Sequence, residues 1–242
     1  MPCNPHASWA EVYDTAYEQV FGSIYETLTV STIAAVQKKY VPPAALVDFG
    51  AGTGRLAIPL ASQGYVVTAV EPCNEMLGEL RRKDPEGRVR AIASSMQDFQ
   101  NDQTFDVALC VFTVLLYLLD EASLRASFRS AADCLKTDGL LLLDIPSCQV
   151  FRSGEVSRGH GFRRAWQVRP VPGEPDLYGY TENIHSTDGR GVERSYEDSF
   201  RIRHWHESIV MKVAEDCGLA NAEGPLPELA ATGSSYFWLR KL

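Results

Sequence analysis

An α/β fold with a doubly wound, mostly parallel sheet is the architecture that this sequence predicts. Between residues 45 and 146, short apolar runs of strand length alternate with stretches of helical periodicity. The first run leads directly into the glycine-rich turn GAGTG at 50–54. A chain of 242 residues is long enough for one such domain and short for two. Together these observations predict a Rossmann-like sheet with right-handed crossovers.

The first 44 residues are expected to be helical, up to a pair of prolines. Apolar side chains recur at helical spacing through 9–40. Pro42-Pro43 ends this region, because proline cannot continue a helix. The run ALVDF at 45–49 then fits a strand that is buried on both faces of a parallel sheet.

A helix is expected after the glycine-rich turn, and further strands follow it. This helix should run to about Ser62, with Gly64 as its stop signal, and Pro59 inside it is expected to bend it. The later expected strands are 66–70, 89–93, 105–110 and 140–145, and the expected helices are 74–82 and 120–134, with a turn at 137–139 before the last strand.

The pattern changes after Pro146. Residues 150–176 are rich in Gly, Pro and Arg, and 177–187 and 192–205 predict an antiparallel hairpin around the turn signal Asp188-Gly189. This hairpin is expected to build on the main sheet, with 162–169 as a candidate third strand. A helix at 207–217 and a final strand at 234–241 complete the prediction.

Composition argues against several classes of partner. The net charge is −8, which opposes binding to nucleic acid or to an anionic membrane. The longest apolar stretches, 107–119 and 140–145, are too short to span a bilayer. The candidate basic positions are dispersed rather than clustered: Arg163, Arg164, Arg169, Arg201 and Arg203.

The cysteines and the amino terminus predict a cytoplasmic protein without a metal. None of the six cysteines forms a C-x-x-C pair or a zinc-like cluster, so reduced thiols are expected. The start MPCNPHASWAEVYD lacks the basic and apolar regions of a signal peptide.

The turn within VDFGAGTGR, 47–55, predicts a nucleoside cofactor. Small residues let the backbone approach a ligand, and glycine tolerates the positive φ of such a turn. The turn follows a strand, where open α/β sheets bind ligands. Glu71 ends the second strand, about 20 residues beyond Gly50, where an acid can accept hydrogen bonds from ribose hydroxyls.

A dinucleotide cofactor is the alternative for this turn. A G-x-G-x-x-G register from Gly50 fails at Arg55, whereas the register from Gly52 matches as GTGRLA and ends at Ala57. That register starts two residues beyond the strand end, which suits a tight turn less well. A nicotinamide-dependent oxidoreductase therefore stays as the alternative enzyme class.

The segment from about 40 to 150 resembles class I S-adenosylmethionine-dependent methyltransferases. The resemblance rests on VDFGAGTGR, VTAVEPCNEML, SSMQDF, FDVALCVFTVLLYL and DGLLLLDIP. It implies a seven-strand sheet and S-adenosylmethionine as cofactor. The residues that it assigns to the cofactor are Asp48, Gly50, Ala51, Gly52, Gly54, Glu71, Pro72, Ser95, Met96 and Val111, and a second resemblance, at the two ends of the chain, adds Tyr13.

The chain departs from that family at one cofactor position. The family often has an acid before the methionine that Met96 matches, and this acid binds the adenine amino group. Here Ser95 takes its place, and its hydroxyl can still accept one hydrogen bond. Asp98 could substitute only if the loop were shifted; the alternative role for Asp98 is a turn or helix cap.

The two ends of the chain resemble small-molecule N-methyltransferases, namely aminosugar N,N-dimethyltransferases and glycine N-methyltransferases. Tyr13-Asp14, Tyr17, the hairpin insertion and the W-H-E sequence at 205–207 carry this likeness. It implies one domain with a helical lid at 1–44, a cofactor-binding core at 45–149, a substrate-covering insertion at 150–205, and a final helix and strand at 206–242. The pocket candidates in these end segments are Tyr17, Tyr178 and Tyr180, and the segment after the fourth strand adds Phe112 and Tyr117; core packing is the alternative role for these rings.

The acceptor is expected to be a small molecule methylated on N or O. Residues 111–118 lack the N/D-P-P-Y/F tetrapeptide of nucleobase amino methylases and the Pro-Cys of cytosine-carbon methylases. No catalytic base stands out. His204 and His206 share one face of a strand, but the sequence shows no third metal ligand beside them. A non-catalytic S-adenosylmethionine-binding protein remains the third alternative, and a homodimer is compatible with the sequence.

Overall fold

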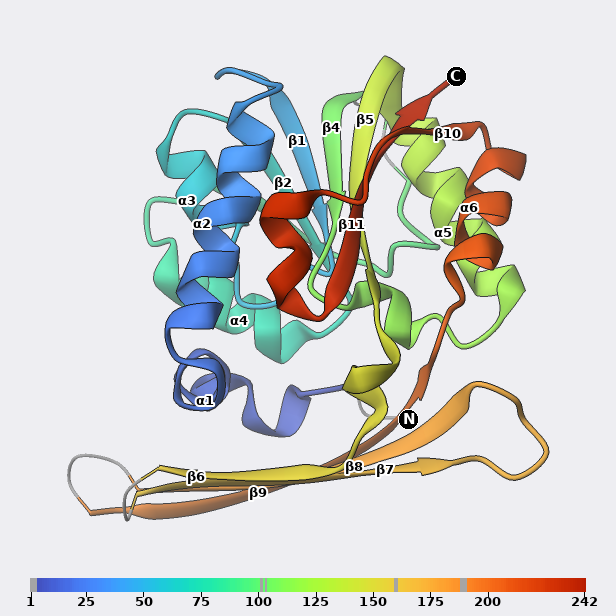
Figure 1. The fold of residues 1–242 in the computed structure, drawn as a ribbon. Coiled ribbons are helices and arrows are strands. Elements are labelled where there is room, and N and C mark those ends of the chain that lie inside the picture. Colours follow the sequence, from blue (N-terminus) through green and yellow to red (C-terminus); the bar gives the residue numbers. More distant parts are fainter. Residues whose placement is uncertain (1–3, 101, 103, 159–160, 188–190) are drawn as a thin grey trace.

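The computed structural model describes residues 4–100, 102, 104–158, 161–187 and 191–242, and it consists of an α/β unit and a separate antiparallel sheet (Figure 1). The seven-stranded sheet has the order β10-β11-β5-β4-β1-β2-β3. Its strands are β1 (Ala45–Phe49), β2 (Val66–Glu71), β3 (Val89–Ala93), β4 (Phe105–Cys110), β5 (Leu135–Pro146), β10 (Leu219–Glu223) and β11 (Ser234–Lys241). The predicted fold class is confirmed.

Pairing within this sheet is parallel except at one edge. β1 pairs in parallel with β2 and β4, and β4 pairs in parallel with β5. β11 runs antiparallel to both β5 and β10. The carboxyl ends of β1, β2, β4 and β5 therefore meet at the edge that faces the second sheet (Figure 1).

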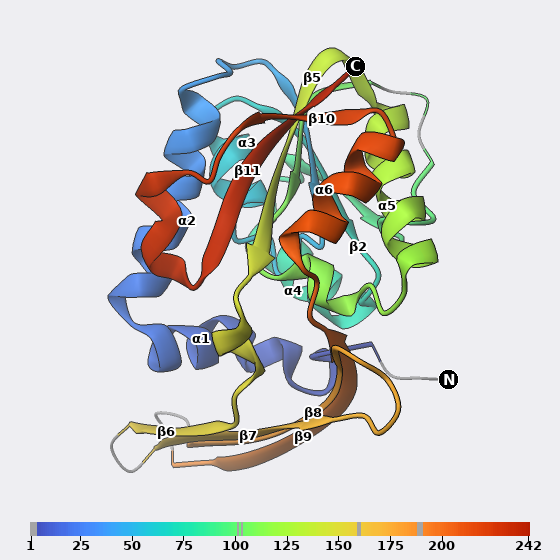
Figure 2. The same ribbon diagram turned by 45° about the vertical axis from the view of Figure 1, so that its right-hand side comes forward.

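Helices cover both faces of the seven-stranded sheet (Figure 2). One face packs against α2 (Ser23–Gln37), α3 (Ala57–Ser62) and α4 (Asn74–Lys83), which bury residues such as Val36 and Leu60. The other face packs against α5 (Glu121–Cys134) and α6 (Glu207–Asp216), which bury Phe128 and Val210. No helix in the described part of the chain is long and apolar enough to cross a membrane.

Two local expectations are corrected. α3 begins at Ala57, so Pro59 lies in its first turn, where a backbone N–H has no partner inside the helix anyway. The expected bend is therefore wrong. The expected turn at 137–139 lies within the bounds of β5, and there Asp138 takes a left-handed conformation with φ of 61°.

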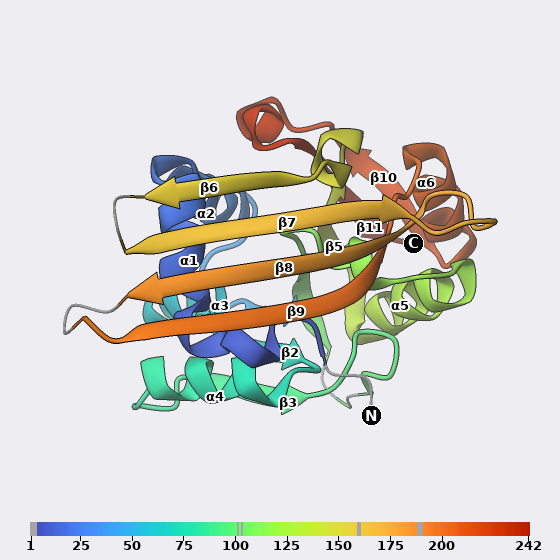
Figure 3. The ribbon, with the colours of Figure 1, turned by 90° about the horizontal axis from the view of Figure 1, so that it is seen from below.

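The insertion forms a sheet of its own, which corrects the expectation that it builds on the main sheet. β6 (Gly154–Arg158), β7 (Phe162–Pro170), β8 (Leu177–Thr187) and β9 (Glu193–Arg203) pair in that order, all antiparallel. Figure 3 shows this sheet lying across the end of the α/β unit. The expected hairpin and its third strand are present, whereas the Asp188-Gly189 turn lies outside the described residues.

The amino-terminal segment lies between the two sheets (Figure 1). A 3-10 helix η1 (Ala7–Val12) and α1 (Tyr13–Phe21) precede α2, and short 3-10 helices η2 (Val114–Tyr117), η3 (Cys148–Phe151) and η4 (Pro227–Thr232) complete the chain. Trp9 is fully buried and packs with Phe162 and Ile184 of the antiparallel sheet. Contacts of this segment thus link the two sheets.

Candidate active site

The glycine-rich turn after β1 requires glycine for two different reasons. Gly50, Gly52 and Gly54 all have positive φ, at 68°, 54° and 84°. A Cβ on Gly50 would lie 2.5 Å from Val114, so that position is closed by packing. A Cβ on Gly52 would meet only the end of the Met76 side chain, at 4.0 Å. The space beside Gly52 is thus the part of the turn that can admit a ligand.

Glu71 is held beside this turn by the backbone. Its carboxylate accepts hydrogen bonds from the N–H groups of Gly52 and Cys73, both at 2.9 Å. Burial raises the pKa of Glu71, and the two backbone hydrogen bonds oppose that rise. An acid oriented in this way at the end of β2 has the position expected for a ribose-binding carboxylate.

Asp48 is a buried carboxyl group. Only 3% of it is exposed, and no hydrogen bond within the described part of the chain lowers its pKa. Burial, together with repulsion from Glu71, raises the pKa of Asp48 to about 7. A cationic group of a ligand would compensate this charge.

Helix α1 is tied to the glycine-rich turn and to α4 through one carboxylate. Asp14 accepts a hydrogen bond from the Thr53 hydroxyl at 2.7 Å and pairs with Lys83 at 2.6 Å. These contacts place Tyr13 and Tyr17 above the site, with ring centroids 4.4 Å apart and nearly parallel planes. The amino-terminal segment therefore covers the carboxyl edge of the sheet.

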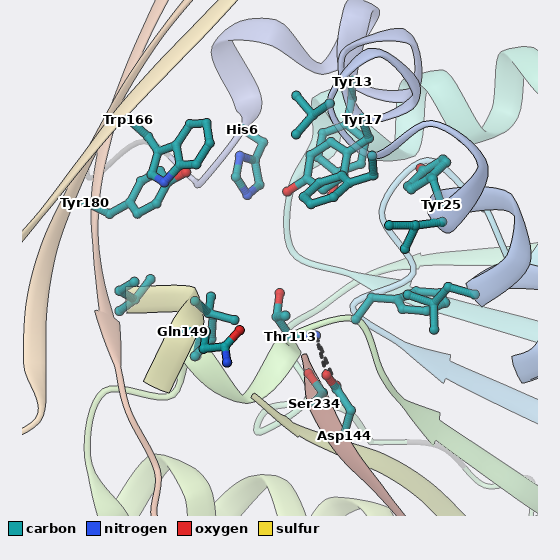
Figure 4. Close-up of a pocket in the computed structure, with 18 of the residues that line it drawn as sticks. His6, Tyr13, Tyr17, Tyr25, Thr113, Asp144, Gln149, Trp166, Tyr180 and Ser234 are labelled. Atoms are coloured by element: carbon teal, nitrogen blue, oxygen red, sulfur yellow. Dashed lines mark hydrogen bonds between the residues drawn. The ribbon is translucent and has the colours of Figure 1, made fainter. Parts of the chain in front are cut away.

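A cavity of about 370 Å³ lies between this edge and the antiparallel sheet (Figure 4). Its walls are mainly aromatic and come from α1, α2, η2, β7, β8, β9 and β11. Five of the aromatic residues that the sequence analysis names line it: Tyr13, Tyr17, Phe112, Tyr117 and Tyr180. Tyr178 does not line it, because its ring packs 4.8 Å from that of Phe151.

Arg55 and Asp144 also line the cavity, and neither was a predicted site residue. The Arg55 guanidinium lies 3.6 Å from the ring centroid of Tyr25 and 4.0 Å from that of Phe112. Asp144, near the end of β5, accepts hydrogen bonds from the backbone N–H of Thr113 (Figure 4). Burial raises the pKa of Asp144 to about 6.

A buried polar network joins the amino-terminal segment to the antiparallel sheet at the cavity. His6 Nδ1 lies 3.2 Å from Glu182 Oε1, and the other Glu182 oxygen accepts two hydrogen bonds from Arg164, at 2.8 and 3.0 Å. His6 Nε2 lies 2.7 Å from the Tyr117 hydroxyl. Burial opposes ionisation of Glu182, but the His6 hydrogen bond and the Arg164 charge outweigh it and lower the pKa.

This network places a hydrogen on Nδ1 of His6. An ionised carboxylate only accepts, so His6 Nδ1 donates to Glu182, which leaves Nε2 of a neutral ring free to accept from the Tyr117 hydroxyl. His6 also lines the cavity. No local sequence pattern signals this network, because His6 and Glu182 are 176 positions apart.

The predicted adenine-side residues lie near one another but are engaged with the protein. The Ser95 hydroxyl donates to Asp98 at 2.5 Å, and the Asp98 N–H returns a hydrogen bond to it at 3.2 Å. Asp98 therefore closes a turn with Ser95, which is the alternative role that the sequence suggests for it. Met96 and Val111 are buried, at 5% and 3% exposure, and the Pro72 carbonyl accepts from Asn4.

Comparison with known proteins identifies the core segment. Residues 46–139 match the family model described as "Methyltransferase domain". A putative methyltransferase of Geobacillus sp. is 33% identical over 104 residues, which are 42% of this chain and 42% of the relative. A dTDP-3-amino-3,6-dideoxy-alpha-D-glucopyranose N,N-dimethyltransferase of Streptomyces fradiae is 27% identical over 135 residues, 56% of this chain and 52% of the relative.

The structural likeness extends over nearly the whole chain. A crystal structure of an S-adenosylmethionine-dependent methyltransferase from Clostridium acetobutylicum matches with a TM-score of 0.81 at 18% identity, covering 96% of this chain and 98% of that one. The chain spans about half the length of the curated relatives it matches. Residues 46–139 therefore match a methyltransferase domain, and the chain as a whole shares its fold with a solved S-adenosylmethionine-dependent methyltransferase.

Proposed function

We propose that this protein transfers a methyl group from S-adenosylmethionine to a nitrogen or oxygen atom of a small molecule, with an amine as the favoured acceptor. The observation that carries the proposal is the juxtaposition of two half-sites. The glycine-rich turn, Glu71 and the buried Asp48 lie at the carboxyl edge of the sheet, and the aromatic cavity begins at Arg55, the residue that follows this turn. The match to the methyltransferase family model and the fold shared with a solved S-adenosylmethionine-dependent methyltransferase support the same function.

The residues present fit this cofactor. Gly52 leaves room for it, Glu71 is oriented toward ribose hydroxyls, and Asp48 lacks a cation that the cofactor's amino group would supply. A nicotinamide cofactor fits less well, because its pyrophosphate would have to sit near two buried carboxylates. When bound, S-adenosylmethionine supplies a methyl carbon activated by a positively charged sulfur.

The cavity walls suit the transfer step. Aromatic faces such as those of Tyr13 and Tyr17 favour a cation beside them, and the mostly apolar lining of the cavity offers few partners to water. The chain's own part would be to hold the acceptor atom facing that methyl carbon and to take up the proton that the acceptor releases. The proton that leaves the acceptor passes to the Tyr117 oxygen while Tyr117 gives its own proton to His6 Nε2.

The buried pair behind Tyr117 stabilises the product of that proton transfer. A protonated His6 would face the Glu182 carboxylate at 3.2 Å, so its new charge is compensated where it forms. Amines favour this arrangement because an amine must be neutral to attack. The aminosugar dimethyltransferase among the relatives supports an amine on a sugar-sized ring, which a cavity of about 370 Å³ can hold.

Binding followed by turnover tests the proposal. Calorimetry should show binding of S-adenosylhomocysteine and none of NAD. Formation of S-adenosylhomocysteine from S-adenosylmethionine should then appear with a panel of aminosugars, other amines and phenols. Binding of NAD in place of S-adenosylhomocysteine would support the oxidoreductase alternative. Cofactor binding without turnover across the panel would support the non-catalytic alternative.

The lid, the location and the oligomeric state belong to the same proposal. Residues 1–44 and the sheet of 150–205 would close over the cofactor and acceptor, as the hydrogen bond and ion pair of Asp14 with Thr53 and Lys83 suggest.

The buried thiols of Cys73, Cys110 and Cys134 suit a reducing compartment such as the cytoplasm. Size-exclusion chromatography with light scattering would distinguish a monomer from a homodimer.

A further inference from the structure

We propose that Asp176, His204 and His206 form a binding site for a divalent transition metal of the zinc class. Each of these residues offers one ligand atom, and the three ligand atoms all lie within 4.8 Å of one another. Two imidazole nitrogens and one carboxylate oxygen are ligands that zinc accepts. The sequence shows the two histidines but not the acid, which lies 28 positions earlier, just before β8, the partner strand of β9.

The separations of these atoms suit a shared ion. His206 Nε2 lies 3.3 Å from Asp176 Oδ2, and His204 Nδ1 lies 3.8 Å from Asp176 Oδ1. Metal–ligand bonds of about 2.0–2.1 Å in a tetrahedron place neighbouring ligand atoms about 3.4 Å apart. Small rotations of the three side chains are therefore enough to bind one ion, with a fourth position left for water.

The backbone brings the ligands together before any ion binds. Leu177 and Arg203 form the last pair of the β8–β9 ladder, so Asp176 and His204 flank that pair on opposite strands. The N–H of His204 donates to the carbonyl of Asp176 at 2.8 Å. His206 is the residue that precedes α6 and is held by the start of that helix. Such pre-organisation lowers the entropic cost of binding.

The other cluster with metal-ligand chemistry does not carry the same inference. His6, Glu182 and Asp198 also lie within 4.8 Å of one another and are buried. The Arg164 guanidinium already forms an ion pair with Glu182 at 2.8 Å, so a cation is in place there. Near Asp176, by contrast, the neighbouring cation Arg203 pairs with Glu174 at 4.0 Å, so its charge is directed toward another carboxylate.

The site is positioned to fix the insertion to the α/β unit. An ion there would link the start of β8, the end of β9 and the entry to α6. The His204 ring also lies 5.1 Å from that of Phe151, and Gln149 and Val150 in the same 3-10 helix line the cavity. The bound metal would therefore act as a clip at the rim of the cavity, whatever reaction takes place inside it.

Calorimetric titration of the full chain, free of chelator, with zinc chloride tests the site directly. We expect one ion per chain with a dissociation constant below about 10 µM, and a rise in melting temperature on saturation. His204→Ala and His206→Ala should each weaken binding at least about tenfold, because even loss of a second-shell partner costs roughly 10–100-fold. Asp176→Asn should weaken it while keeping the side chain's size and its backbone contact.

His185→Ala provides the matched control. His185 lies near the far end of β8, the strand that follows Asp176, and it hydrogen-bonds Ser195. Because it is remote from the three ligands, the variant should bind zinc like the parent. Circular dichroism shows whether each variant is folded. A dissociation constant above about 10 µM in the parent, or equally tight binding by a folded His204→Ala/His206→Ala double variant, would overturn the proposal. Neither result bears on methyl transfer.

Discussion

Asp48→Asn removes a buried charge that the folded protein tolerates only at a cost. The pKa of Asp48 is raised to about 7 by burial and by repulsion from Glu71, against an ordinary value of 3.8. The unfolded chain therefore releases this proton at lower pH than the folded chain does. As pH rises from about 4 to about 7, the folded state loses stability relative to the unfolded state, and the loss is complete above about 7.

The size of this effect follows from the pKa difference. A difference of about 3 units corresponds to about 4 kcal/mol of folding free energy at pH 8. Between pH 5 and 8 the same linkage gives a change of about 2–3 kcal/mol. Asparagine cannot ionise, so the variant lacks this dependence. Glu71 and Asp144 titrate in both proteins, and their contributions largely cancel in the comparison.

Urea unfolding of both proteins across this pH range is the assay. The free energy of unfolding of the variant minus that of the parent should become more positive by about 2–3 kcal/mol from pH 5 to pH 8. Saturating S-adenosylhomocysteine should lessen that change, because its amino group pairs with the ionised Asp48. The variant should also bind this ligand more weakly at pH 8.

Two results would refute the reasoning. A difference in unfolding free energy that stays constant from pH 5 to 8 would mean that Asp48 ionises as it does in the unfolded chain. Parent-like affinity of the folded variant for S-adenosylhomocysteine would mean that the ligand's amino group binds elsewhere.

Four further predictions concern the cofactor, the proton acceptor and the lid. Glu71→Ala should weaken S-adenosylhomocysteine binding about 10–100-fold, since a hydrogen bond to a charged group contributes roughly 1.5–3 kcal/mol; an unchanged dissociation constant by calorimetry would make this acid purely structural. Gly52→Val should abolish binding in a folded protein, because its side chain occupies the space beside the turn, and near-parent affinity would remove the glycine-turn assignment. His6→Gln should lower turnover by about 100-fold or more, with S-adenosylhomocysteine affinity kept; equal turnover would exclude the relay. Hydrogen exchange of 9–20 and 150–190 should slow when S-adenosylhomocysteine binds, and equal exchange in both segments would exclude a lid.

The sequence by itself determined the α/β core and its glycine-rich turn. Strands such as 45–49 and 105–110 are buried on both faces, so each appears as a short apolar run whatever surrounds it. The turn at 50–54 needs glycine for local backbone reasons, and these are visible without the rest of the chain. Pro59 was misjudged because its effect depends on where the helix begins, which only the structure shows.

Tertiary structure alone decided how the site is closed. The edge strand β10, LANAE, and the short β6, GEVSR, carry little apolar alternation, so the sequence analysis missed both. Whether the insertion extends the main sheet or forms its own depends on which edge its strands meet, and hairpin periodicity is the same in either case. Likewise, the pairing of His6 with Glu182, and of Asp176 with His204 and His206, joins polar residues from separate segments. Such pairs leave no periodic trace in the sequence, because periodicity records which face of one element is buried and not which distant element covers it.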